Sequence, residues 1–238
     1  MNESPQGANR EAEPVSVPFD RVAAFVRHFS HDVRNTLNAM DLQTAFAVEI
    51  ATDPEVSAEL KKVRAMINQG ARMMQAVSSN FWLNEPNLIE YSARILVEDL
   101  RDRMSRLLPD HISQIEWTND VQEEKIAVDL EMICSATGEL LKNAFHFGEP
   151  GHRVAVRASA ADGQFALELR EPRKSVASPP EQWGREPLLS TRRGGYGLSL
   201  FHARAILKAH RGELDITHDP AASLLLTRVT LPLASPAK

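Results

Sequence analysis

The sequence has a single cysteine, Cys134, among 238 residues, which excludes both an internal disulfide framework and a cysteine-rich zinc cluster. Long hydrophobic runs are missing too, since none approaches the roughly 18–20 apolar residues that span a bilayer. The N-terminus lacks the cationic start and apolar core of a secretory signal. Positive charge is not in excess, because 27 Lys and Arg face 32 Asp and Glu. We therefore expect a cytoplasmic protein that neither inserts into membranes nor binds nucleic acid.

What is present has the composition of a globular protein, with 43% hydrophobic and 25% charged residues. Residues 1–18 contain few large apolar side chains and predict a disordered tail, and residues 235–238 form a short tail at the other end. The chain between them changes character near residue 84. Helical patterns fill the first part, whereas strands and helices alternate in the second.

Two apolar stripes at helical spacing predict a long helical hairpin. The first helix is expected over Phe19–Ile50, and the second begins at Pro54, where Asp53 can cap it. Because a lone hairpin buries only one side of each helix, we expect a second copy to complete a homodimeric four-helix bundle. The pattern alone fits equally well with a helical subdomain that packs on the rest of the chain.

The second part alternates strands and helices without a strict βαβ rhythm, which predicts a mixed sheet with helices on one face. A long loop is expected over residues 171–195, and long loops in compact domains are often functional or mobile. Strands are expected at 88–91, 115–118, 125–128, 154–158, 165–169, 214–217 and 224–232, and helices at 93–108, 130–147 and 198–209.

The segment Phe29–Leu37 places one histidine on the polar side of the first helix. Phe29 lies on the apolar stripe, and at about 100° per residue His31 lies about 200° round the helix from it, facing solvent. Histidine changes charge near neutral pH, so an exposed imidazole can act as a nucleophile. Asp32 can orient the ring or accept its proton, and Asn35, one turn later, can position a water. An exposed histidine on a helix is, however, more often an ordinary surface residue.

A second polar cluster lies in the predicted helix 130–147. Glu139 and Asn143 are four residues apart, so they share a helix face on which both side-chain oxygens could reach a hydrated Mg²⁺. Lys142 and His146 form a second pair with the same spacing, which suits contact with phosphates. The alternative is an ordinary amphipathic helix with a solvated polar face.

A glycine-rich turn opens the last predicted helix. Arg192 and Arg193 come before it, Gly195 and Gly197 lie in it, and Leu198 starts the helix. Glycine lets the backbone approach a polyphosphate, and a helix N-terminus presents free amides. Turns of this kind are also common without a ligand, but the two arginines favour an anion site.

The order and spacing of these three motifs resemble the core of the sensor histidine kinases. A histidine box in a helical hairpin is followed by an asparagine box and then by a glycine box, and the resemblance covers residues 19–234. It implies an α+β fold in which the hairpin, residues 19–83, serves dimerisation and histidine phosphotransfer. Residues 84–234 would then form a Bergerat-type α/β sandwich, the ATP-binding catalytic domain.

The resemblance also implies roles for individual residues. His31 would be the phosphoacceptor and Asp32 its acidic helper, while Asn35 stands where many relatives carry the residue used to dephosphorylate the partner. Asn143 would ligate Mg²⁺, and Glu139 would assist it or polarise the attacking histidine. ATP would be held by residues from the helix, the loop and the glycine box, namely Asn143, Lys142, His146, Glu171, Arg192, Arg193, Gly195, Gly197 and Leu198.

One stretch departs from the pattern of this family. Before the loop the family usually has Asp-x-Gly-x-Gly, whose carboxylate reads the adenine amino group, but this sequence has Glu171, Arg173 and Ser175 at the three positions. Because bulk replaces both glycines where the backbone must come close, the difference predicts weakened or abolished nucleotide binding. Thr36 also replaces the proline that is usual after the histidine box.

Three functional hypotheses follow. The leading one is a histidine kinase that phosphorylates His31 from ATP and passes the phosphoryl group to an aspartate on a separate response regulator receiver domain. The alternative is a nucleotide-independent dimeric histidine phosphotransferase that relays phosphoryl groups between receivers. A third is a scaffold or phosphatase that works through Asn35. In each case we expect a homodimer and a separate sensor or input protein.

Overall fold

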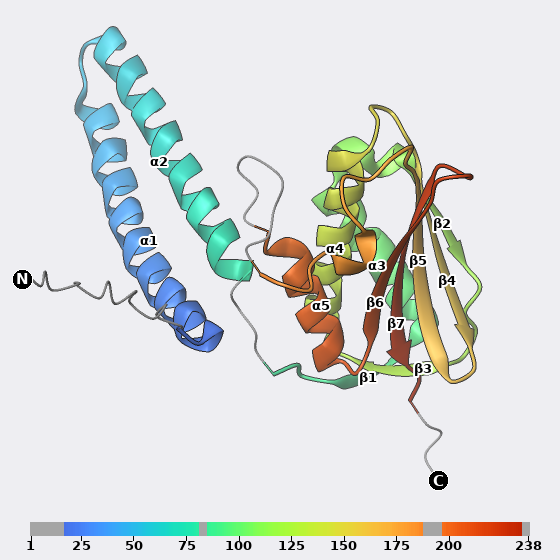
Figure 1. The fold of residues 1–238 in the computed structure, drawn as a ribbon. Coiled ribbons are helices and arrows are strands. Elements are labelled where there is room, and N and C mark those ends of the chain that lie inside the picture. Colours follow the sequence, from blue (N-terminus) through green and yellow to red (C-terminus); the bar gives the residue numbers. More distant parts are fainter. Residues whose placement is uncertain (1–16, 81–84, 188–196, 235–238) are drawn as a thin grey trace, which may run out of the picture. The chain divides into compact units, whose positions relative to one another are not determined.

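The computed structural model describes residues 17–80, 85–187 and 197–234, and the two predicted tails lie almost entirely outside this part of the chain. The chain divides into two compact units, Met1–Phe81 and Trp82–Lys238 (Figure 1). The described part of the first unit is helical and the second unit is mixed, as the α+β prediction requires. None of the described helices is long and apolar enough to cross a membrane.

The first unit is the predicted hairpin. Helix α1 covers Phe19–Ile50 and helix α2 covers Pro54–Asn80. The turn between them works as the sequence suggests, because the Asp53 carboxylate accepts the backbone N–H of Glu55 at 2.8 Å and Pro54 starts the helix without needing a donor. Both predicted helices are confirmed.

Few of the described apolar side chains are buried between α1 and α2. Ala23 and Ile67 are two that are. A polar contact supplements them, because the Asp41 carboxylate accepts from Arg64 Nε at 2.8 Å and from the Asn68 amide at 3.0 Å. The hydrogen bond from Arg64 is the main reason why the pKa of Asp41 lies below its usual value.

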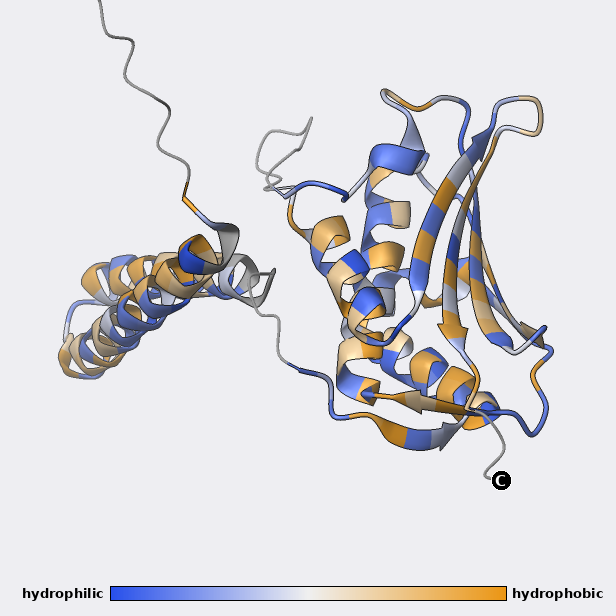
Figure 2. Ribbon diagram, turned by 60° about the horizontal axis from the view of Figure 1, so that its bottom comes forward, coloured by the Kyte–Doolittle hydropathy of each residue, from blue (hydrophilic) through white to orange (hydrophobic). Residues whose placement is uncertain are grey.

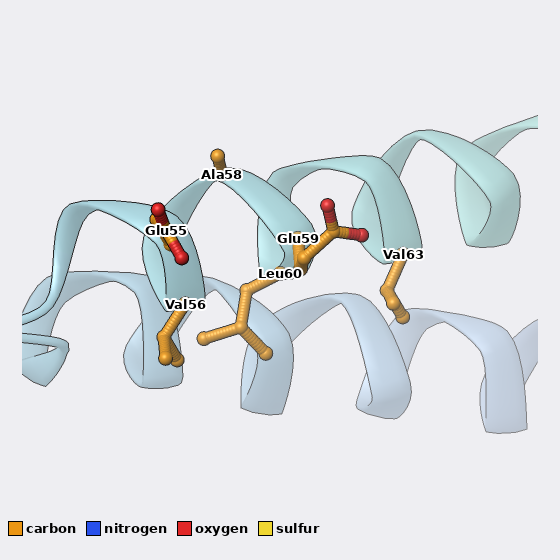
Figure 3. Close-up of a pocket in the computed structure, with 6 residues that line it drawn as sticks. All are labelled: Glu55, Val56, Ala58, Glu59, Leu60 and Val63. Atoms are coloured by element: carbon orange, nitrogen blue, oxygen red, sulfur yellow. The ribbon is translucent and has the colours of Figure 1, made fainter.

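Much of the apolar surface of the hairpin stays exposed. Figure 3 shows Val56, Leu60 and Val63 of α2 pointing toward the neighbouring helix beside a shallow pocket, and both valines remain about half exposed. Other large apolar side chains exposed on the hairpin are Phe25, Phe29, Met40, Leu42, Phe46, Ile50, Met66 and Met73. Such a surface, in a unit with so small a core, is typical of an interaction face.

The second unit is built on a five-stranded mixed sheet with strand order β2-β4-β5-β7-β6, in which only the β2–β4 pair is parallel. The five strands are β2 (Ile115–Asn119), β4 (Val154–Ala161), β5 (Gln164–Pro172), β6 (Glu213–Asp219) and β7 (Leu224–Pro232). A separate two-stranded sheet pairs β1 (Ile89–Ser92) with β3 (Lys125–Val128). The predicted β6–β7 hairpin and mixed sheet are confirmed.

Three helices cover one face of the large sheet: α3 (Ala93–Leu107), α4 (Leu130–Phe147) and α5 (Ser199–Ala209) (Figures 1 and 2). Apolar residues alternate with polar ones along the strands, and the apolar set meets the helices in one core. The other face is polar, with a charged row that crosses four strands in register, made by Arg157, Glu168, Arg228 and Asp215.

Strand β5 is longer than predicted. The sequence suggested a strand over 165–169 and a loop from residue 171, but β5 runs to Pro172 because β7 is long enough to pair with it, Glu171 lying opposite Leu225. Two short 3-10 turns, Pro109–Gln114 and Pro180–Gln182, were also not predicted. The extension of β5 matters for the site, because it fixes Glu171 within a sheet.

Candidate functional site

His31 lies on the solvent-facing side of α1, where the sequence placed it. The side chain of His31 is 69% exposed and that of Asp32 is 79% exposed. The Nδ1 atom of His31 lies 3.2 Å from Asp32 Oδ1 and 3.4 Å from the Asn35 amide nitrogen. The carboxylate can only accept, so its contact needs a proton on Nδ1, whereas the Asn35 amide nitrogen can only donate and would need a lone pair there. The shorter contact, to Asp32, favours the tautomer with the proton on Nδ1, in which the Nε2 lone pair is free to react.

Thr36 leaves the backbone hydrogen bonding of this part of α1 uninterrupted. Its hydroxyl donates to the Asp32 carbonyl at 3.1 Å, and α1 continues unbroken to Ile50. A proline in this place would remove a backbone donor and bend the helix. The departure from the family pattern at Thr36 therefore leaves the spacing of His31, Asp32 and Asn35 that of a regular helix.

The polar face of α4 holds the second predicted cluster, with one contact that the sequence did not suggest. Lys142 Nζ donates to Glu139 Oε1 at 2.9 Å, so Lys142 pairs with Glu139. His146 is exposed and packs edge-on against Phe147, with ring centroids 5.0 Å apart. Asn143 lies between the two, and its buried amide nitrogen has no hydrogen-bond partner among the described residues.

The start of α4 is tied to the end of α5 by a histidine. The Asp129 carboxylate caps α4 by accepting the Met132 N–H at 3.2 Å. The Asp129 N–H itself donates to Nε2 of buried His210 at 3.0 Å, while Nδ1 of His210 bonds the Ile206 carbonyl at 2.8 Å. This arrangement fixes the neutral Nδ1–H tautomer of His210 and the position of α4.

The fit of Mg²⁺ to this face depends on another ligand. Glu139 and Asn143 offer three side-chain oxygens, one of which, Glu139 Oε1, already forms an ion pair with Lys142. No group of three or more His, Cys, Asp or Glu among the described residues could hold a metal ion. Mg²⁺ is commonly held by one or two protein oxygens together with substrate phosphates. The predicted ligands Glu139 and Asn143 would therefore hold Mg²⁺ only together with a bound nucleotide.

The carboxylate predicted to read adenine is already bound within the chain. Arg173 donates from its Nη2 atom to Glu171 Oε1 at 2.7 Å, and the side chains of Arg173 and Glu171 are only 13% and 5% exposed. Burial raises the pKa of the Glu171 carboxyl, and the charge and hydrogen bond of Arg173 oppose that rise. His152 lies near, with its Nε2 atom 3.9 Å from the second carboxylate oxygen.

Three other segments hold Arg173 in place. Its Nη1 atom donates to the Phe147 carbonyl at the end of α4. Its backbone N–H donates to the Ser223 carbonyl at 2.7 Å, and its own carbonyl accepts from His218 Nε2 at 2.8 Å. These contacts hold Arg173 in a fixed position between the end of α4 and the β6–β7 hairpin.

These residues do not fit an adenine nucleotide as they stand. An adenine amino group needs a carboxylate oxygen that it can reach. Glu171 Oε1 and the Phe147 carbonyl both accept from Arg173, and Glu171 Oε2, which has no hydrogen-bond partner among the described residues, is buried. The glycines that would let the backbone approach are replaced by Arg173 and Ser175. The predicted role of Glu171 requires that Arg173 first leave.

The glycine box is only partly described. Gly197 has a φ of 63°, in the left-handed region that glycine adopts readily, and Leu198 is buried in front of α5. Arg192, Arg193 and Gly195 lie outside the described residues. The residue before α5, Leu198, makes no side-chain cap hydrogen bond.

Sequence reasoning missed the roles of Arg173, His152 and His218. It treated Arg173 as bulk in place of glycine and assigned no role to His152 or His218. The one signal available was the spacing of Glu171 and Arg173, since residues two apart in an extended segment point to the same side. The position of His152 depends on a turn in which its Nδ1 atom lies 2.6 Å from the Glu149 carbonyl oxygen, and the sequence does not predict that turn.

Comparisons with known proteins agree with this architecture. No family model matches the chain. Sensor histidine kinase CusS of Escherichia coli O157:H7 is 23% identical over 225 residues, which is 88% of this chain and 45% of the relative. The sensory histidine kinase/phosphatase NtrB of Salmonella typhimurium is 26% identical over 210 residues, which is 82% of this chain and 58% of the relative. The chain thus spans about half the length of the curated relatives it matches.

Solved structures of histidine kinases have the same fold. Full-length ShkA, in complex with AMPPNP, superposes with a TM-score of 0.71 at 19% identity, covering 91% of this chain and 47% of ShkA. The catalytic domain of histidine kinase ThkA gives a TM-score of 0.51 at 16% identity, covering 61% of this chain and 95% of ThkA. The chain has the fold of a histidine kinase core, a helical hairpin followed by an α/β domain.

Proposed function

We propose that the chain carries a phosphoryl group on His31 in two-component signalling and delivers it to an aspartate of a separate receiver domain. The observation that carries the proposal is the arrangement of His31, Asp32 and Asn35 on an exposed helix face, with Nδ1 directed to a carboxylate. A phosphoryl carrier must be reached by its partners, and both side chains of the His31–Asp32 pair are open to solvent.

The proposed step uses Nε2 of His31 as the nucleophile. The Nε2 lone pair forms a bond to phosphorus, and the P–O bond of an aspartyl phosphate on the donor breaks to release the free carboxylate. The proton stays on Nδ1, where Asp32 balances the positive charge that develops on the ring. Delivery is the reverse step, in which a receiver carboxylate attacks phosphorus and His31 leaves as a neutral imidazole.

The buried Glu171–Arg173 pair favours a phosphorylated receiver as the donor over ATP. Because Arg173 binds one oxygen of the Glu171 carboxylate and the other oxygen is buried, an adenine amino group would lack its recognition contact on the route from nucleotide to His31. The function best supported is therefore that of a histidine phosphotransferase, which relays phosphoryl groups between receiver domains.

A homodimer supports this role. The exposed apolar side chains of α1 and α2 leave the hairpin with more uncovered apolar surface than a stable helical unit keeps. A second copy would bury this surface in a four-helix bundle. The dimer would present two copies of His31 on opposite sides of a symmetric rod.

ATP-dependent autophosphorylation of His31 is the second candidate, and two observations favour it. The polar face of α4 retains Glu139, Lys142 and Asn143, with a buried Asn143 amide that has no partner among the described residues. The curated relatives are kinases by name. ATP, with Mg²⁺, would supply the phosphoryl group, and Asn143 and Glu139 are the residues placed to meet the metal.

The experiment compares the two phosphoryl donors directly. The protein is incubated with receiver domains from the same genome, labelled beforehand with ³²P acetyl phosphate, and separately with labelled ATP and Mg²⁺. We expect acid-labile label on the wild type from at least one phospho-receiver and none from ATP. His31→Ala should abolish it. His28→Ala, which removes another exposed histidine from α1, should label normally.

Label that survives in His31→Ala would refute the proposal, and so would its absence from the wild type in both arms. Label from ATP alone would establish the second candidate. If no label forms but the protein shortens the life of the phospho-receiver, and Asn35→Ala prevents this, the chain is a phosphatase.

A further inference from the structure

The Arg173 side chain is largely buried, and its contacts come from several elements of the fold. Its guanidinium donates to two acceptors from different elements, the Glu171 carboxylate in β5 and the Phe147 carbonyl that ends α4. Its backbone is held at both ends by Ser223 and His218. An arginine is costly to bury unless its charge is paired and its donors are used. The charge of Arg173 is paired with Glu171 and both terminal nitrogens donate, while its Nε atom has no hydrogen-bond partner among the described residues.

A second pair on the same strand gives the contrast. Glu168 and Arg170 have the same two-residue spacing as Glu171 and Arg173, but they lie on the polar face of the sheet, where Arg170 is 48% exposed. The Arg170 Nη2 atom donates to Glu168 Oε2 at 2.8 Å. The two pairs are alike in sequence and bond length, yet only the Glu171–Arg173 pair is closed off from solvent and linked to α4.

We propose that Arg173 is a built-in ligand of Glu171 that takes the place of a purine amino group and prevents nucleotides from binding there. The guanidinium presents one N–H to a carboxylate oxygen and another to a backbone carbonyl. An exocyclic amino group has two N–H donors and could satisfy the same two acceptors. The inference concerns the second unit alone and does not depend on the chemistry of His31.

Removal of the Arg173 side chain should therefore open a site with a defined preference. In Arg173→Ala, the Glu171 oxygen and the Phe147 carbonyl are left as two acceptors beside a cavity. A purine with an amino group, such as that of ADP, supplies donors to both. The inosine analogue IDP carries a carbonyl oxygen there and would face two acceptors without a donor, which costs affinity.

The test is calorimetric titration of Mg·ADP and Mg·IDP into the full chain. We expect no saturable binding up to 1 mM for the wild type or for Arg170→Ala, the matched control from the exposed pair. Arg173→Ala should bind ADP with a dissociation constant below 1 mM and prefer it to IDP by tenfold or more. The double variant Glu171→Gln, Arg173→Ala should lose most of that preference, because the acceptor becomes an amide.

Two results would overturn the inference: wild type that binds ADP as tightly as Arg173→Ala, or a folded Arg173→Ala that binds ADP no better than wild type. If Arg173→Ala does not fold, the wild type decides by NMR of its arginine Nε–H signals, with Arg173→Lys used to identify the Arg173 signal. That signal should stay unmoved up to 5 mM ADP, and displacement by ADP would refute the built-in ligand. None of these results depends on whether a phospho-receiver labels His31.

Discussion

The two units of this chain differ in how far their reactive and charged side chains are exposed to solvent. In the hairpin, which has few buried apolar residues, the side chains of His31 and Asp32 are exposed to solvent. In the α/β unit, Glu171 and Arg173 are buried against each other beside a large core. Exposure suits a residue that must meet partner proteins, whereas burial suits a contact that holds elements together.

The contrast extends to what determines each arrangement. The spacing of His31, Asp32 and Asn35 follows from one regular helix, so neighbours in the sequence are neighbours in space. The position of Arg173 depends on Phe147, His218 and Ser223, which lie far from it in the sequence. A local site tolerates changes elsewhere in the fold, while a site built from distant segments does not.

The largest expected effect comes from breaking the exposed face of the hairpin. Phe25 and Phe29 of α1 stack with ring centroids 5.9 Å apart and are 67% and 52% exposed. If they are buried in a dimer, Phe25→Glu with Phe29→Glu places charges in an apolar interface. The mass in solution should fall from twice 26.5 kDa to 26.5 kDa, as measured by light scattering.

Leu42→Glu is the matched control for the dimer test. Leu42 is 70% exposed on the same helix but lies on the side that carries His31, at about 20° from it if each residue turns the helix by about 100°. We expect this variant to remain dimeric. A wild type that is monomeric at micromolar concentration would contradict the dimer, and dissociation by Leu42→Glu would place the interface on the wrong face.

A smaller effect compares one substitution in the two units. Leu141 of α4 is fully buried, with 0% exposure, whereas Leu42 is exposed. Leu141→Ala should lower the free energy of unfolding of the α/β unit by about 2–5 kcal/mol, because it removes buried surface and leaves a cavity. Leu42→Ala should change the free energy of unfolding of the hairpin by less than about 0.5 kcal/mol. Urea unfolding followed by circular dichroism measures both, and similar losses would show that the two units do not differ in packing.

The contrast between the units also explains how far the sequence could lead. The bounds of α1 and α4 agree with the predicted 19–50 and 130–147, because long apolar stripes and helix caps are local signals. The exposed face of His31 could be predicted for the same reason. The Glu171–Arg173 contact could not, because it needs the extension of β5 to Pro172 and the end of α4 above it.

The smallest expected effect is the response to pH of one buried and one exposed carboxylate, both in the α/β unit. Burial raises the pKa of Glu171, so the folded chain holds this proton more tightly than the unfolded chain does. As pH rises through the usual glutamate range and the raised pKa, the unfolded state gains relative to the folded one. The stability of the wild type relative to Glu171→Gln should therefore fall as pH rises from 4 to 7, in urea unfolding at several pH values.

Glu149 should show the opposite slope. It lies in the turn after α4, and the hydrogen bond from Lys174 at 2.8 Å lowers the pKa of its carboxyl. The folded chain releases this proton more readily, so the stability of the wild type relative to Glu149→Gln is present above the usual glutamate range and is lost as pH falls through the lowered pKa. Because Glu149 is exposed, its slope should be the shallower of the two. Slopes of the same sign would mean that the charge of Arg173 outweighs the burial of Glu171, with the carboxylate of Glu171 held ionised by its ligand.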